Sequence, residues 1–248
     1  MANRLLKTNR VVAIAALAAC TPLMTAQAAM IDFSFIDPGT TTAGFSVESF
    51  VAAGGSAVPA GSITGGGDIA KEFGVESIRL DLDGIDLDID IDNGSGLGNP
   101  YFDNVFQGRR GGLGNCRDLT ATAQCNPSSD DNVTMASGEA LLFSFETDAG
   151  AATKALFGDF IFRENDHYLF NGSVAVLADG GLTVISVTNG VGDLSVLGAT
   201  SALEFLSDSG TTDNYYIDMA NINVVPVPAA VWLFGSALGL LGWMRRRA

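Results

Sequence analysis

A two-residue alternation of side-chain type is the feature that most constrains this chain. Apolar and polar residues alternate, or short apolar blocks recur, in nine segments: 31–36, 45–51, 77–92, 141–146, 156–163, 168–177, 182–187, 202–206 and 215–225. Successive side chains of a strand point to opposite faces, so this period predicts nine β-strands. Between two of them, Asp179-Gly180-Gly181 predicts a hairpin, because glycine adopts positive φ without steric cost.

Helical periodicity occurs only near the two ends of the chain, so the predicted class is all-β. The segment 29–224 is long enough for one large core, and no Pro/Ser-rich linker divides it. We therefore expect a single β-sandwich domain of jelly-roll type over residues 29–224.

Residues 1–28 have the features of a secretory signal peptide. Three cations (Arg4, Lys7 and Arg10) precede an apolar run at 11–19, and Ala26-Gln27-Ala28 supplies the small-x-small pattern of a cleavage site. Leu17-Ala18-Ala19-Cys20 also fits a lipobox, so lipidation of Cys20 is an alternative way of processing the same segment.

Residues 225–248 contain the longest uncharged apolar run of the chain. No residue from 224 to 244 is charged, and at ~1.5 Å per residue this run spans about 30 Å, the thickness of a bilayer core. Arg245, Arg246 and Arg247 follow it. We expect a transmembrane helix whose arginines stay in the cytoplasm, which places the preceding domain outside.

The same tail carries a recognisable motif. Its parts are Val225-Pro226-Val227-Pro228-Ala229, Trp232-Leu233-Phe234-Gly235-Ser236 and the three terminal arginines. Together they resemble the PEP-CTERM sorting signal in its VPxPA form. Val227 stands where the Pro-Glu-Pro form has glutamate. The resemblance, confined to 225–247, implies an exosortase-type processing enzyme as partner, cleavage near the prolines, and transfer from the inner membrane to the cell surface or an exopolysaccharide matrix.

The charge of residues 29–224 excludes one class of function. Seven of the 13 Lys and Arg and all 28 acidic residues lie in this segment, which gives it a net charge of −21. Such a domain repels DNA and RNA and favours solubility and cation binding.

Two further features concern cysteines and carboxylates. Cys116 and Cys125, nine positions apart in a glycine-rich loop, predict a disulfide and therefore an oxidising compartment.

A possible calcium site combines four carboxylates of turn-prone sequence: Asp92, Asp103, Asp130 and Asp131. Within 77–92, Gly84 interrupts the alternation and predicts a bulge; the aspartates at 86, 88, 90 and 92 share one strand face, as a solvated surface or a calcium site.

No residue constellation typical of an enzyme is present. His167, the only histidine, is interpreted as part of a turn before the strand that begins at Tyr168. The leading hypothesis is a non-catalytic surface or matrix protein associated with exopolysaccharide. One alternative is a carbohydrate-binding module, with contacts from Tyr215 and Tyr216 and further aromatic candidates at Tyr101, Phe102 and Tyr168. Another is a polysaccharide-active enzyme on a jelly-roll scaffold.

Overall fold

The structure is a computed structural model that describes residues 28–33, 41–42, 45–52, 56–58, 73–74, 77–82, 85–90, 99–103, 109–116, 118, 120, 125, 133, 140–206 and 214–224. All of them belong to one compact unit, Ala26–Pro226. Apart from short 3-10 turns such as η3 (Ser195–Leu197), the described regular elements are strands.

The structure describes sixteen strands. The first eight are β1 (Ala28–Asp32), β2 (Thr41–Thr42), β3 (Phe45–Ala52), β4 (Ser56–Val58), β5 (Phe73–Gly74), β6 (Ser77–Asp81), β7 (Ile85–Asp90) and β8 (Asn99–Asp103). The remaining eight are β9 (Gly112–Cys116), β10 (Ala140–Thr147), β11 (Ala155–Glu164), β12 (Gly172–Ala178), β13 (Gly181–Thr188), β14 (Val191–Asp193), β15 (Ala202–Leu206) and β16 (Tyr215–Val224). The all-β prediction is confirmed.

The strands form one continuous antiparallel sheet, so the prediction of a two-sheet sandwich was wrong. The order is β2-β3-β6-β7-β10-β15-β12-β13-β14-β11-β16-β9-β8-β5, with β1 added to β16 and β4 to β3. The three-residue strand β14 is the physical reason. It pairs with β13 on one side and β11 on the other, so the hydrogen-bonded ladder continues where a sandwich would be interrupted.

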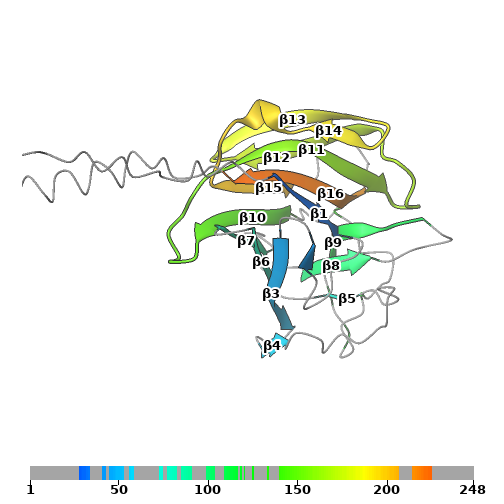
Figure 1. The fold of residues 1–248 in the computed structure, drawn as a ribbon. Helices are drawn as coiled ribbons and strands as arrows, with labels where there is room; N and C mark the ends of the chain where they lie inside the picture. Colours follow the sequence, from blue (N-terminus) through cyan, green and yellow to red (C-terminus); the bar gives the residue numbers. More distant parts are fainter. Residues whose placement is uncertain are drawn as a thin grey trace, which may run out of the picture. The chain divides into compact units, whose positions relative to one another are not determined.

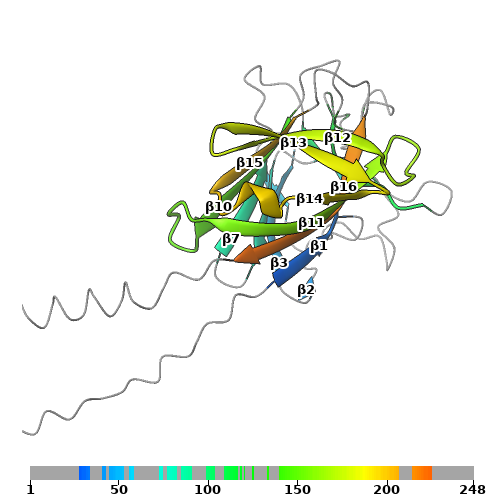
Figure 2. The same ribbon diagram turned by 90° about the horizontal axis from the view of Figure 1, so that it is seen from above.

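The sheet folds back over itself and encloses an aromatic core. Phe143 of β10 and Phe160 of β11 both contact Phe205 of β15, with ring centroids 5.1 and 5.6 Å apart. In the view of Figure 1, β13, β14 and β11 lie above β15 and β16, while β10, β7, β6 and β3 lie below them. Figure 2 shows β1, β16, β11 and β14 side by side, in the order of their pairing.

The predicted long strand at 77–92 is a hairpin of two strands. β6 and β7 pair with Ile78 opposite Ile89, and Leu82 donates a backbone hydrogen bond to Ile85 at 2.8 Å. The bulge predicted at Gly84 is therefore wrong, because the chain reverses between Leu82 and Ile85. The two-residue alternation itself is confirmed, since Ile78, Leu80, Leu87 and Ile89 are all buried.

The hairpin predicted at Asp179-Gly180-Gly181 is present. Ala178 pairs with Gly181, and the two residues between them, Asp179 and Gly180, have φ of 45° and 85°. Positive φ at both central positions is the geometry that matches the right-handed twist of the flanking strands. β12 and β13 are thereby fixed in register.

Candidate functional site

The sorting motif and the membrane segment lie outside the described residues. This applies to Val225, Pro226, Val227, Pro228 and Ala229 and to Arg245, Arg246 and Arg247, because the described chain ends with β16 at Val224. Within the part of the chain that the structure describes, no helix combines the length and hydropathy that a bilayer crossing requires. The sorting signal and its helix stay predictions.

The calcium site also stays a prediction. Asp92, Asp130 and Asp131 lie outside the described residues, and Asp103 is the last residue of β8. Among the residues that are described, no group of three or more His, Cys, Asp or Glu side chains is arranged to hold a metal ion.

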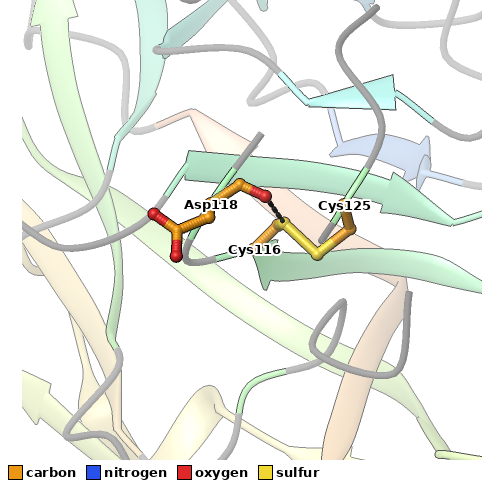
Figure 3. Close-up of a disulfide and its surroundings, with 3 residues drawn as sticks. All are labelled: Cys116, Asp118 and Cys125. Atoms are coloured by element: carbon orange, nitrogen blue, oxygen red, sulfur yellow. Dashed lines mark hydrogen bonds between the residues drawn. A yellow bond between two sulfur atoms is a disulfide. The ribbon is translucent and has the colours of Figure 1, made fainter. Parts of the chain in front are cut away.

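The two cysteines form the expected disulfide. Cys116, at the end of β9, is joined to Cys125 with an S–S distance of 2.00 Å and a Cα–Cα distance of 5.6 Å. Both are buried and form a small apolar cluster with Tyr101. Cys116 Sγ lies 3.3 Å from the backbone carbonyl oxygen of Asp118, and Figure 3 marks this contact with a dashed line. The bridge joins two residues nine positions apart and holds Cys125 beside the end of β9.

The aromatic candidates for carbohydrate contact are mostly buried. Tyr215 and Tyr216 are each 1 % exposed, so the prediction that they contact a glycan was wrong. Tyr215 points into the core, where its ring contacts Phe162 and its hydroxyl donates to the Leu206 carbonyl at 2.9 Å. Burial raises the pKa of Tyr215 above its ordinary value. Tyr101 and Phe102 are also buried; Tyr168, at 49 %, is the exposed member of the set.

The aspartate row on β7 faces an arginine rather than open solvent alone. Arg79 of β6 lies opposite Asp88 in the sheet, and its Nε and Nη2 donate to the two carboxylate oxygens at 2.7 and 2.6 Å. Asp86 and Glu146 lie 3.5 Å from the same guanidinium. Asp86 is only 5 % exposed, which the interpretation of a fully solvated face missed. The hydrogen bonds to Asp88 raise the pKa of Arg79.

A second group of charged residues lies around a bulge in β16. Ile161 pairs with Met219 and Phe162 with Ile217, so Asp218 is an extra residue between two ladder positions. The bulge keeps Ile217 and Ala220 in the core. A bulge bends its strand and redirects a side chain, and bulges are frequent near functional sites. Asp218 is the side chain that this bulge redirects.

Asp218 is a buried carboxylate with one paired oxygen. Its Oδ2 accepts a hydrogen bond from Arg163 Nε at 2.8 Å and lies 2.7 Å from Arg163 Nη2, whereas Oδ1 has no hydrogen-bond partner among the described residues. Burial raises the pKa of Asp218, and the hydrogen bond and charge of Arg163 oppose that rise. Arg163 therefore compensates only part of the cost of burying this charge.

The turn after β11 joins this ion pair to a second segment. Arg163 Nη1 donates to the carbonyl oxygen of His167 at 3.3 Å, and His167 has a φ of 60° and is 4 % exposed. The His167 ring packs edge-on against Tyr216, with centroids 5.3 Å apart, and its Nδ1 lies 3.4 Å from the carbonyl oxygen of Arg109. His167 is in a turn, as predicted, but it is a buried packing residue.

Two neighbouring arginines complete the group. Arg110 Nη1 donates to Asp32 of β1 at 2.8 Å. Arg109 places its guanidinium carbon 3.7 Å from the centre of the Tyr168 ring and donates from Nη2 to the Tyr168 hydroxyl. We call Arg109, Arg110 and Arg163 the arginine cluster. Sequence reasoning missed it; the signal was the scarcity of cations, since these are three of only seven in 29–224.

Comparisons with protein-family models, with curated proteins and with solved structures found no match to this chain.

Proposed function

We propose that the chain is an exported, non-catalytic protein of the cell surface or extracellular matrix, processed by an exosortase-type enzyme and associated with exopolysaccharide. One observation carries the proposal. Residues 225–247 combine a Val-Pro-Val-Pro-Ala motif, an uncharged span of membrane length and the three terminal arginines at 245–247. A leader-like segment at the other end predicts the same orientation across the membrane.

The positions of the first and last strands of the chain, β1 and β16, support this proposal. β1 starts at Ala28, the last residue of the predicted leader, and β16 ends at Val224, directly before the sorting motif. β1 and β16 pair with each other, from Ala29 opposite Ile222 to Asp32 opposite Met219. Cleavage at both predicted places would remove the two ends and retain this pairing from Ala29 onwards.

Two properties of the domain are compatible with a location outside the cytoplasm. A disulfide such as Cys116–Cys125 persists in an oxidising compartment. The net charge of −21 keeps a surface domain soluble and disfavours self-association.

Mass spectrometry of the mature protein tests the proposal. The full gene is expressed in a bacterium that has an exosortase, and intact masses are measured for the membrane, surface and medium fractions. We expect an N-terminus at Ala29 and a C-terminus near Pro226 or Pro228; a lipidated Cys20 would appear in the same spectrum as a heavier N-terminal fragment. A full-length chain, soluble inside cells with both ends intact, would contradict the proposal.

A matched pair of variants connects the result to the motif. Replacing Pro226 and Pro228 by alanine is expected to leave the tail attached and the protein in the membrane fraction. Replacing Pro59, which lies outside the motif, by alanine is expected to leave processing unchanged.

The structure bears differently on the two alternative hypotheses. Tyr215 and Tyr216 no longer support the carbohydrate-binding hypothesis, because both are buried. The hypothesis of a polysaccharide-active enzyme stays a prediction that requires two carboxylates about 5–10 Å apart in an open cleft.

A further inference from the structure

Positive charge is concentrated at one place in a strongly acidic domain. Three of the seven cations in 29–224 form the arginine cluster, beside the end of β11 and the bulge of β16. Two carboxylates contact the cluster: Asp218 pairs with Arg163, and Asp32 pairs with Arg110. The third arginine differs from the other two.

Arg109 contacts an aromatic ring in place of a carboxylate. Among the described residues its guanidinium has Tyr168 as hydrogen-bond acceptor and ring partner, and no ion pair joins it to an acidic side chain. A guanidinium carries five N–H donors in a planar fork that matches the two oxygens of a carboxylate. Among the described residues, the one hydrogen bond that this half-buried guanidinium donates goes to the Tyr168 hydroxyl.

The pair is held in place before any ligand arrives. The main-chain carbonyl of Arg109 contacts His167, and the turn that carries Tyr168 is fixed by hydrogen bonds from His167 to Glu164 at 2.7 Å and from Glu164 to Tyr168 at 2.9 Å. The ring and the hydroxyl of Tyr168 then orient the arginine side chain. Such preorganisation lowers the conformational entropy that binding would otherwise cost.

We propose that Arg109 and Tyr168 form a binding site for a carboxylated sugar, the uronate unit of an acidic polysaccharide. The guanidinium supplies a bidentate partner for the carboxylate. Arg109 covers one face of the Tyr168 ring, and Tyr168 as a whole residue is 49 % exposed, so in this proposal the C–H face of the sugar next to that carboxylate packs against the part of Tyr168 that Arg109 leaves uncovered. The site deepens the proposed function and rests on it for a place where the protein meets polysaccharide.

The charge of the whole domain acts against this site at long range. At about 0.15 M salt the Debye length is about 8 Å, which screens distant carboxylates more than a direct guanidinium–carboxylate contact. Binding to Arg109 is therefore best measured at this ionic strength, where the long-range repulsion is reduced.

The test is a titration of the purified mature protein, with its ends as the cells leave them, against tetragalacturonate. Isothermal calorimetry at 0.15 M NaCl is expected to show binding by the wild type and at least a tenfold weaker Kd for Arg109→Gln. Arg109→Lys, which keeps the charge without the fork, is expected to lose about threefold. Tyr168→Ala is expected to weaken binding as Arg109→Gln does.

Two controls separate a binding effect from misfolding. Lys154→Gln removes an exposed cation that already pairs with Asp179 at 3.1 Å, and is expected to bind like the wild type. Each variant is accepted only if it keeps the wild-type far-UV circular dichroism spectrum and a cooperative thermal transition that starts well above the titration temperature; if Arg109→Gln is unfolded, Arg109→Lys is the variant that decides the test.

Further ligands identify the recognised chemistry. Methyl-esterified tetragalacturonate is expected to bind at least tenfold more weakly, and a hexaglutamate peptide is expected not to bind. If the ester binds as tightly as tetragalacturonate, the proposed carboxylate contact is wrong. If the peptide binds as tightly as tetragalacturonate, the proposed recognition of a sugar is wrong. If tetragalacturonate does not bind at millimolar concentration, the proposed site is wrong. These outcomes do not depend on processing, so a failure here is distinct from a failure of the sorting signal.

Discussion

At the scale of single residues, the pair of Arg163 and Asp218 is the most deeply buried ion pair among the described residues, with side chains 19 % and 1 % exposed. Removing one member of a buried pair leaves the other charge without compensation, which costs about 3–5 kcal/mol. We expect Asp218→Ala to lower the free energy of unfolding by that amount, measured by urea denaturation. The half-exposed pair of Arg110 and Asp32 is the matched comparison, and Asp32→Asn is expected to cost about 1 kcal/mol or less.

The double variant Arg163→Met with Asp218→Leu distinguishes charge from packing. Replacing a buried pair by apolar residues of similar size is often close to neutral. We expect this variant to be more stable than Asp218→Ala alone. Equal destabilisation of Asp218→Ala and Asp32→Asn would show that the burial of Asp218 carries no special cost.

Asp179 predicts a dependence of stability on pH. Hydrogen bonds from Thr200, Ser201 and Lys154 hold the pKa of this turn carboxylate below its ordinary value. A lowered pKa in the folded state contributes stability above the ordinary aspartate value of about 4, and this contribution is lost as the pH falls toward the folded pKa. Asp179→Asn is therefore expected to cost about 1 kcal/mol at pH 7 and progressively less below pH 4.

Chemical denaturation at several pH values measures this difference. Asp148→Asn, which replaces another exposed turn carboxylate by an amide, is the control for the substitution itself. A stability difference for Asp179→Asn that stays constant down to pH 2 would contradict the prediction.

At the scale of elements, close backbone approach fixes how β9 meets β16. A Cβ atom on Gly112 would lie 2.5 Å from the backbone oxygen of Ile217, so Gly112→Ala would push the two strands apart. We expect a loss of about 3 kcal/mol or more. Gly180 has open space around its position but a φ of 85°, and Gly180→Ala is expected to cost about 1 kcal/mol. Thermal unfolding should rank the two variants in this order.

The same elements show which strands the sequence could predict. The sequence also predicted β12 and β16, although each buries consecutive apolar residues, Val174 to Val176 in β12 and Tyr215 to Ile217 in β16. Alternation identified β10, β11, β13 and β15, where buried apolar residues recur mostly at every second position. It missed β9, whose sequence Gly-Leu-Gly-Asn-Cys carries few apolar side chains although all five residues are buried. It also missed β14, which has three residues and joins the two halves of the sheet. Short or glycine-rich strands form because they pair with neighbouring strands of the sheet, and the periodicity of a sequence does not show which segments will pair.

At the scale of the whole molecule, the site formed by Arg109 and Tyr168 could not be predicted from the sequence, again because it depends on strand pairing. Arg109 and Tyr168 are 59 positions apart and belong to segments without a motif. Arg109 precedes β9 and Tyr168 follows β11, and the pairing of both strands with β16 brings the two residues together. The disulfide was predictable because two cysteines nine positions apart have few alternatives, whereas a cation has 28 carboxylates and several aromatic rings as possible partners.

The pairing of β1 with β16 makes the stability of the whole domain depend on its first strand. Ile31 is fully buried in β1 opposite Ala220, while the preceding Met30 is 57 % exposed. We expect Ile31→Ala to cost about 3 kcal/mol, as for other buried large-to-small changes, and Met30→Ala to cost less than about 0.5 kcal/mol.

Two probes decide whether this loss extends through the molecule. β1 lies beside β16, which also pairs with β11 and β9, so one continuous sheet should unfold as a unit when its first strand is weakened. Far-UV circular dichroism and tyrosine fluorescence are expected to report the same lowered midpoint in Ile31→Ala. A circular dichroism transition that keeps the wild-type midpoint while the fluorescence shifts would mean that β1 detaches alone, and the strand would then be an attachment to the sheet instead of part of its cooperative core.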